Sequence, residues 1–181
     1  MEKILISGTG RCGTTFLIRL FTFLEFDTGY TKQNFMKSIF KNCNSGMEKN
    51  INDKHYILKN PNFILDIEKI LKSMKIKKMI IPIRNYHDSA ASREKHGKAA
   101  GGLWHATNTD SQLSFYYKII SQYTYYMTKY DIPTIFLDFE RMTSDKTYLY
   151  EKLKPILDEK NIKFETFSKV YDEVDVLSKR K

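Results

Sequence analysis

The sequence has few cysteines and no long apolar run, and each shortage excludes a class of protein. Only two of the 181 residues are cysteine, Cys12 and Cys43, which is too few for a disulfide framework. No apolar stretch approaches the ~20 residues that a membrane-spanning helix requires. The first predicted strand begins by Lys3, which leaves no room for a targeting segment. We therefore expect a cytoplasmic protein without a membrane span.

Metal-ligand clusters and basic blocks are also missing. No group of Asp, His and Cys residues has the spacing of metal ligands, so we expect no metal site. The formal net charge of +9 comes from lysines that are scattered along the chain. This charge suits an anionic ligand such as a nucleotide. The Tyr and Phe residues form no recognisable RNA-binding platform, so we expect no nucleic-acid partner.

What the sequence does contain is a regular alternation of predicted strands and helices. Its 181 residues, 41% of them hydrophobic, suffice for a single domain that spans residues 1–181. Alternating strands and helices are typical of an α/β fold, which predicts a three-layer αβα domain around a central parallel sheet. Strands are predicted near residues 4–6, 55–59, 78–83 and 133–139, helices over residues 14–24, 63–74, 86–95, 110–130 and 146–160, and a loosely attached helical tail after Phe164.

The first strand leads into a glycine-rich loop, Ser7-Gly8-Thr9-Gly10-Arg11-Cys12-Gly13-Thr14-Thr15. Glycines allow backbone N–H groups to approach a phosphate, and the helix N-terminus that follows adds unpaired donors. Gly8 and Gly13 have the spacing of a Walker loop, G-x-x-x-x-G-K-[ST], but Thr14 stands where the lysine should be. The loop therefore predicts a phosphate site other than one for the β- and γ-phosphates of ATP with magnesium.

A second group of polar residues follows the third predicted strand. Arg84 lies at the end of that strand, and Ser92 lies about two helical turns further along. The planar guanidinium of arginine suits phosphate oxygens, and a serine hydroxyl adds one more donor. Both groups lie at strand ends, where open parallel sheets bind their ligands.

Together the two stretches resemble the cofactor motifs of sulfotransferases that use 3′-phosphoadenosine 5′-phosphosulfate (PAPS). Arg11-Cys12-Gly13-Thr14-Thr15 is similar to the 5′-phosphosulfate loop [RK]-[SG]-G-T-T, and Arg84 to Ser92 is similar to the 3′-phosphate motif R-[ND]-x-x-D-x-x-x-S. The resemblance implies a P-loop-like sulfotransferase fold that binds PAPS and releases PAP. It implies cofactor contacts from these residues: Gly10, Arg11, Cys12, Gly13, Thr14, Thr15, Arg84 and Ser92.

Sulfuryl transfer needs cations near the bridging and sulfuryl oxygens and a base for the acceptor hydroxyl. Arg11 and Lys59 are the predicted cations, since Lys59-Asn60-Pro61 resembles the family's lysine-containing strand end. That stretch has no catalytic histidine, so the base must come from elsewhere. Glu48 is the preferred catalytic base by region, and the other candidates stay open: Asp27, His55, His87, His96 and His105.

The sequence predicts a sulfotransferase that moves a sulfuryl group to a hydroxyl, or secondarily an amine, of a small-molecule or carbohydrate acceptor. Trp104, the only tryptophan, lies in a predicted loop over residues 97–109. It has three open roles: stacking on adenine, lining the acceptor pocket, or anchoring the loop. The alternatives to a sulfotransferase are a P-loop-type kinase, which would require magnesium, and a non-catalytic module that binds PAP or nucleic acid.

Overall fold

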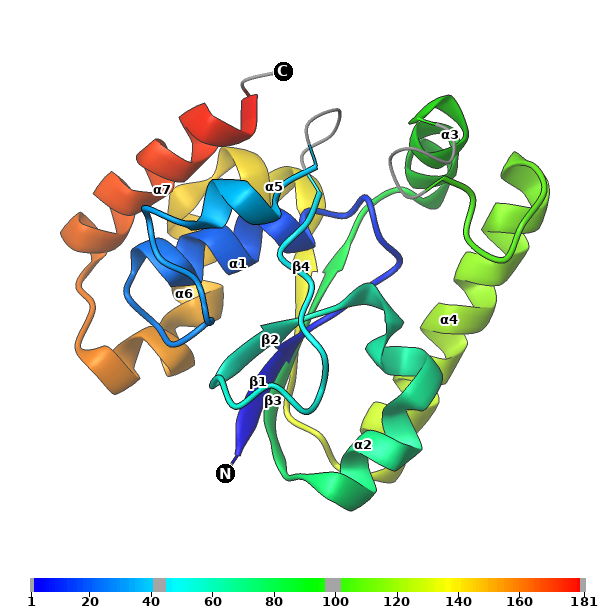
Figure 1. Ribbon diagram of the computed structural model, residues 1–181, viewed down its shortest axis with the longest axis horizontal. Helices are drawn as coiled ribbons and strands as arrows, with labels where there is room; N and C mark the ends of the chain where they lie inside the picture. Colours follow the sequence, from blue (N-terminus) through cyan, green and yellow to red (C-terminus); the bar gives the residue numbers. More distant parts are fainter. Residues whose placement is uncertain (1, 41–44, 97–101, 180–181) are drawn as a thin grey trace.

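The computed structural model describes residues 2–40, 45–96 and 102–179 (Figure 1). Within these ranges four strands form one sheet in the order β2-β1-β3-β4, and all neighbouring strands are parallel. The expected α/β fold with a parallel central sheet is confirmed. Cys43 and part of the predicted loop, residues 97–101, lie outside the described residues. The strands are β1 (Lys3–Ile6), β2 (Ile57–Lys59), β3 (Ile76–Ile83) and β4 (Thr134–Asp138).

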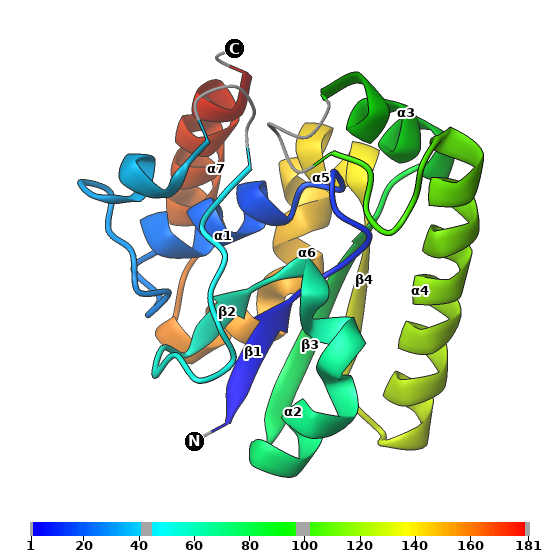
Figure 2. The same cartoon turned by 45° about the vertical axis from the view of Figure 1, so that its right-hand side comes forward.

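Helices cover both faces of the sheet (Figure 2). Helices α1, α6 and α7 lie on one face, and α2 and α4 lie on the other, so the described chain has three layers. The α-helices are α1 (Thr14–Phe23), α2 (Ile67–Ser73), α3 (Tyr86–His96), α4 (Thr109–Lys129), α5 (Phe139–Ser144), α6 (Lys146–Leu157) and α7 (Phe164–Lys179). The short 3-10 helices among the described residues are η1 (Phe35–Ser38), η2 (Pro61–Asp66) and η4 (Asp158–Lys160).

Strand β1 illustrates how the sequence builds this sandwich. Ile4 and Ile6 belong to the apolar cluster beneath α1 and α7, whereas Leu5 belongs to the cluster beneath α2 and α4. Successive side chains of a strand point to opposite faces, so an uninterrupted apolar run contributes side chains to the apolar clusters on both faces of the sheet. All three side chains are fully buried, which fixes β1 at the centre of the molecule.

The order of the strands creates a switch point between β1 and β3. The chain leaves β1 to reach β2 on one side, and it leaves β3 to reach β4 on the other. Connections that diverge in this way open a crevice beyond the carboxyl ends of the two strands. The glycine-rich loop follows β1 and Arg84 follows β3, so both predicted phosphate motifs border this crevice.

One predicted strand and one predicted helix were wrong in their boundaries. The strand predicted to run to residue 139 ends at Asp138, whose side chain accepts a hydrogen bond from the Arg141 backbone and caps α5. The helix predicted over 63–74 is α-helical only from Ile67, because Pro61 begins a 3-10 turn. In that turn the Asn60 side chain accepts a hydrogen bond from a backbone N–H two residues later.

The expectation of a loosely attached tail was also wrong. Helix α7 packs along α1, and its residues Phe167 and Val174 are fully buried. The ring of Tyr171 meets Phe16 of α1 edge to face, with ring centroids 5.5 Å apart. An apolar stripe at helical spacing thus holds α7 against α1.

Candidate functional site

The loop between β1 and α1 is held in a conformation that requires glycine. Gly10 and Gly13 have left-handed backbone angles, with φ of 73° and 87°. A Cβ on Gly10 would lie 2.1 Å from Arg93 Nη2, and one on Gly13 would lie 2.4 Å from Met142 Cε. The backbone angles therefore favour glycine at both positions, and a larger residue would also have to displace the ends of these neighbouring side chains.

The N-terminus of α1 is open toward this loop. Gly13 is the N-cap, no side chain caps the helix, and its first turn carries no acidic residue. The first N–H groups of a helix have no partner within the helix, and the helix dipole places partial positive charge there. Gly13, Thr14 and Thr15 line a cavity at this end of α1. This geometry suits an anion such as a phosphate.

The two sequence motifs meet at this cavity although they are about 80 residues apart. Arg84 Nη1 donates a hydrogen bond to the Arg11 carbonyl oxygen at 3.2 Å. Arg11 Nε in turn donates to Ser92 Oγ at 3.3 Å. Arg11 and Arg84 both line the cavity, and the Arg84 guanidinium lies 4.9 Å from the centre of the Phe139 ring. Two guanidinium groups are thus fixed beside the open end of α1.

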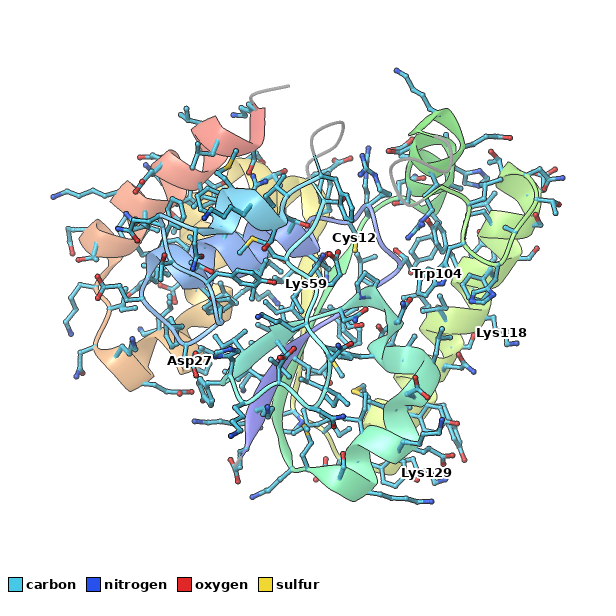
Figure 3. The ribbon with its side chains drawn as sticks, in the orientation of Figure 1. Cys12, Asp27, Lys59, Trp104, Lys118 and Lys129 are labelled. Carbon is cyan, nitrogen blue, oxygen red and sulfur yellow. The ribbon has the colours of Figure 1, made fainter. Side chains whose placement is uncertain are left out.

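The side chains of Cys12 and Ser92 are not in the cavity wall, although their motifs imply contact with the cofactor. The Cys12 side chain is fully buried toward Gly8, and burial raises the pKa of its thiol. Figure 3 shows Cys12 in the loop above Lys59. Only the Cys12 backbone is therefore available to a ligand, and Ser92 orients Arg11.

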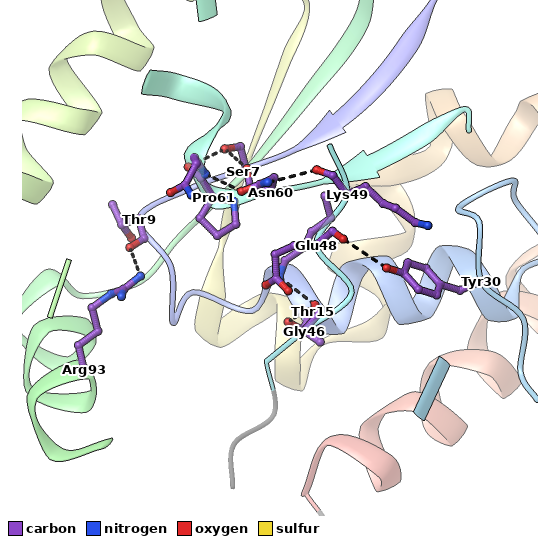
Figure 4. Close-up of polar contacts among 12 residues, drawn as sticks. Ser7, Thr9, Thr15, Tyr30, Gly46, Glu48, Lys49, Asn60, Pro61 and Arg93 are labelled. Carbon is purple, nitrogen blue, oxygen red and sulfur yellow. Dashed lines mark hydrogen bonds and ion pairs between the residues drawn. The ribbon is translucent and has the colours of Figure 1, made fainter. Parts of the chain in front are cut away.

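Lys59 ends β2 and points into the same cavity. Its side chain is 1% exposed, and Nζ donates to the Gly46 carbonyl oxygen at 3.0 Å and to Glu48 Oε1 at 2.5 Å. Burial lowers the pKa of Lys59, while the negative charge of Glu48 opposes that shift. Thr15 Oγ1 donates to the same Gly46 oxygen at 3.5 Å, so α1 and β2 converge there (Figure 4).

The segment around Glu48 is anchored on both sides. Met47 is buried in the core, and its N–H donates to the Ser38 carbonyl oxygen. Lys49 N–H donates to the Lys59 carbonyl oxygen at 2.9 Å. Glu48 lies between these anchors, and its side chain remains 37% exposed. A carboxylate is therefore held against Lys59 with one side open to the cavity.

The other candidate bases whose side chains the structure describes are not brought to the cavity. His55 and Asp27 pair at 2.7 Å near the start of β2, and Figure 3 shows Asp27 there, away from Lys59. His87 lies exposed in the first turn of α3. His105 packs against Phe115 of α4, with ring centres 5.0 Å apart. His96 ends α3, but its side chain is outside the described part of the structure.

Trp104 is also absent from the cavity wall, and its contacts favour the anchoring role. Its ring lies 5.1 Å from Phe115 and 5.3 Å from the guanidinium of Arg93. The backbone N–H of Trp104 donates to Gln112 Oε1 at 2.6 Å. These contacts fix residues 102–108 against α4.

Sequence reasoning missed several contributors to the cavity, among them Arg19, Arg93 and the end of α7. Arg93 is 8% exposed and donates from Nη1 to the Gly102 carbonyl oxygen at 2.7 Å and from Nη2 to the Thr9 carbonyl oxygen at 3.5 Å. An arginine in a polar helix such as α3 gives no sequence signal of burial. Asp175, Ser178 and Lys179 line the cavity only because α7 packs on α1.

The cavity is large enough for a nucleotide and carries a clear excess of positive charge. Its volume is about 530 Å³, within the usual range for small-molecule sites. Glu48 and Asp175 are the acidic residues in its described wall. The cations in its described wall are Arg11, Arg19, Lys59, Arg84, Arg93 and Lys179. An anionic ligand is favoured, and the described residues contain no cluster of His, Cys, Asp and Glu that could hold a metal ion.

No protein-family model matches the sequence, and no curated protein is detectably similar to it. Among solved structures, the fold is similar to that of a retinol dehydratase in complex with androsterone and the inactive cofactor PAP. The TM-score is 0.53 and the identity 13%, over 98% of this chain and 66% of the dehydratase chain. This chain therefore spans about two thirds of the length of that protein. At this identity the likeness shows the fold alone, an α/β architecture with helices on both faces of a parallel sheet.

Proposed function

We propose that the protein is a PAPS-dependent sulfotransferase that acts on a hydroxyl of a small molecule or carbohydrate, with an amine as the secondary alternative. The observation that carries this proposal is the contact between Arg84 and Arg11 at the open end of α1. It brings two guanidinium groups together in one cavity at the switch point of the sheet, as a cofactor with two separate phosphate groups would require. The similar fold of a protein crystallised with PAP supports the same reading.

The residues of the cavity match the charges of PAPS. The 5′-phosphosulfate would lie against Gly10, Gly13, Thr14 and Thr15, where the N–H groups of the loop and of α1 are open. The 3′-phosphate would lie against Arg84, whose planar guanidinium suits phosphate oxygens. Arg11 contacts both Arg84 and Ser92, so it would lie near both groups. Cys12 would contribute its backbone, and Ser92 would hold Arg11 in position.

Lys59 and Glu48 are the proposed catalytic residues together with Arg11. When bound, PAPS would supply the activated sulfuryl group. Lys59 and Arg11 would stabilise the negative charge that grows on oxygen during transfer. Glu48 would accept the proton of the acceptor hydroxyl, since it is the candidate base in the described cavity wall. An acceptor oxygen beside Lys59 Nζ is within reach of the Glu48 carboxylate, because the two groups are 2.5 Å apart.

Ligand binding followed by thermal unfolding tests the proposal. PAP at about one hundred times its dissociation constant should stabilise the protein by about 2.7 kcal/mol, which corresponds to a rise in Tm of about 5–10 °C. The rise should not require magnesium. A rise with ATP and magnesium, but none with PAP, would instead support the kinase. Binding of PAP without any release of sulfate from PAPS would support a non-catalytic module.

A further inference from the structure

Arg19 is a buried charge in the middle of an apolar helix. It lies in α1, where every residue from Thr14 to Phe23 is buried, and it is itself only 2% exposed. Its flanking residues Ile18 and Leu20 are fully buried in the hydrophobic core. Arg19 instead lines the cavity of the candidate site. The helix therefore carries one charged side chain toward the ligand space.

The contacts of Arg19 leave its charge uncompensated among the described residues. Nη1 donates to Ser178 Oγ at the long distance of 3.4 Å, and the guanidinium lies 5.7 Å from the centre of the Phe35 ring. Nε is buried without a hydrogen-bond partner in the described structure. Asp175 also lines the cavity, but it pairs with Lys179 at 2.6 Å. No described carboxylate forms an ion pair with Arg19.

Such an arrangement is costly unless a ligand completes it. A buried charge without a counter-ion loses its favourable hydration free energy, and its apolar surroundings compensate for little of that loss. Burial lowers the pKa of Arg19, but an arginine remains protonated at neutral pH. The buried Nε–H is a donor that the described protein does not satisfy, and buried donors are normally satisfied. An anion in the cavity would supply the missing acceptor.

The position of Arg19 separates it from the proposed cofactor contacts. It lies one helical turn beyond Thr15, whereas Arg84 and Ser92 come from the end of β3 and from α3. Thr15 and Lys59 donate to the same Gly46 oxygen, so the next turn of α1, which carries Arg19, forms the part of the cavity wall adjacent to Lys59. It is close enough for its charge to disfavour the protonated form of Lys59. The space it borders adjoins the proposed site of transfer.

We infer that Arg19 binds an anionic group on the acceptor, so that the acceptor is a hydroxyl compound that also carries a carboxylate, sulfate or phosphate. This inference rests on the proposed function. The phosphate and sulfate groups of PAPS already have Arg11, Arg84, Lys59 and the end of α1 as partners. Of the other cations in the described wall, Arg93 donates to backbone carbonyl oxygens and Lys179 pairs with Asp175. Arg19 is therefore the cation assigned to the acceptor, since an arginine can hold a carboxylate or a sulfate with two parallel hydrogen bonds.

Matched pairs of acidic and neutral ligands test the inference. The probes are 4-hydroxyphenylacetate against its amide, and glucuronate against glucose, each titrated by calorimetry into the PAP-loaded protein. The acid of each pair should bind about ten- to a hundredfold more tightly than its neutral partner, the range expected for a charged hydrogen bond. The Arg19→Met variant should lose this preference, and Arg19→Lys should retain part of it.

Lys118→Met is the matched control. It removes the same charge from an exposed position on α4 that does not line the cavity, and Figure 3 shows Lys118 far from Lys59. It should leave the preference for acids unchanged. The ligand-free proteins give a second readout. If Arg19 is kept for ligand binding, Arg19→Met should melt at a higher temperature than the wild type, because an uncompensated buried charge has been removed. Lys118→Met should melt at nearly the wild-type temperature.

Three results would overturn the inference. Acid and neutral probes could fail to differ in both pairs, Arg19→Met could lose its affinity for PAP, or Arg19→Met could melt at a lower temperature than the wild type. The second result would make Arg19 a cofactor ligand, and the third would make it a structural residue. Failure of the wild type to bind PAP would count against the proposed function instead. The acid and neutral probes would then be compared on the ligand-free protein.

Discussion

Lys59 Nζ and Glu48 Oε1 lie 2.5 Å apart at the point where β2 ends, with the lysine buried and the carboxylate open to the cavity. The pair joins the core of the sheet to the segment that precedes β2. The two side chains differ in exposure, because Lys59 has lost its contact with solvent and Glu48 has kept part of it. The proposed roles of cation and base follow from this difference.

Replacing Lys59 should slow turnover more than it weakens cofactor binding. A cation that stabilises charge present only in the transition state contributes to kcat and little to KM. Lys59→Ala should lower the rate of PAPS cleavage by about 10²–10³. Slow hydrolysis of PAPS serves as the assay until an acceptor is known. Lys49→Ala is the control, since Lys49 lies outside the cavity wall. Equal rates in Lys59→Ala and wild type would remove Lys59 from the mechanism.

The pH dependence of stability reports the burial of Lys59. Its pKa in the folded protein is lowered from about 10.5 by burial, so the unfolded chain binds more protons in the window below that value. The unfolding free energy therefore rises with pH across this window. Urea unfolding of wild type and Lys59→Met between pH 7 and 10 should show a difference that shifts in favour of the wild type as pH rises. A flat or opposite trend would indicate that Glu48 outweighs burial.

Glu48→Gln should reduce turnover while leaving PAP binding nearly intact. The amide keeps the shape of the side chain but cannot accept a proton, and loss of a general base costs about 10²–10⁴ in rate. Asp27→Asn is the control, because the paired Asp27 and His55 lie outside the cavity wall. Turnover measured under saturating PAPS distinguishes the two variants. Loss of activity in Asp27→Asn, with Glu48→Gln still active, would reassign the base.

Arg84 should distinguish cofactors by their 3′-phosphate. Arg84→Ala should weaken PAP binding by about 1.5–3 kcal/mol, the value of a hydrogen bond to a charged group. It should affect adenosine 5′-phosphosulfate much less, because that compound has no 3′-phosphate. Calorimetry on both ligands measures the difference. Equal losses for both would mean that Arg84 acts by holding the Arg11 carbonyl, the contact seen at 3.2 Å.

Gly13→Ala tests the conformation of the glycine-rich loop. A non-glycine residue at φ 87° costs about 1–2 kcal/mol, and the new Cβ would also approach Met142 Cε to 2.4 Å. Urea denaturation should show a loss of at least this size, together with weaker PAP binding. Adding Met142→Ala should remove the contact but keep the backbone strain, so its rescue of PAP affinity should be partial. Unchanged PAP affinity in Gly13→Ala would contradict the proposed phosphate loop.

The sequence by itself determined those features of the protein that follow from the order of residues within one strand, helix or loop. The alternation of apolar strands and amphipathic helices predicted the parallel α/β sheet, because each periodicity buries one or both faces of its own element. The spacing of Gly8, Gly10 and Gly13 predicted an anion loop, and Arg84 was placed at a strand end. Parallel strands end on one edge of the sheet, so the two motifs were expected near each other.

The tertiary structure decided which distant side chains face that edge. The pairing of Glu48 with Lys59 depends on how Met47 packs in the core, and no local pattern reports this. Arg19 and Arg93 have the sequence environment of ordinary helical residues, but packing turns both into the cavity wall. The sequence predicted helix α7 as a loosely attached tail, whereas in the structure its apolar stripe packs against α1. Burial, and the charge balance that it creates, arises from contacts between elements, so it is fixed only when those elements come together.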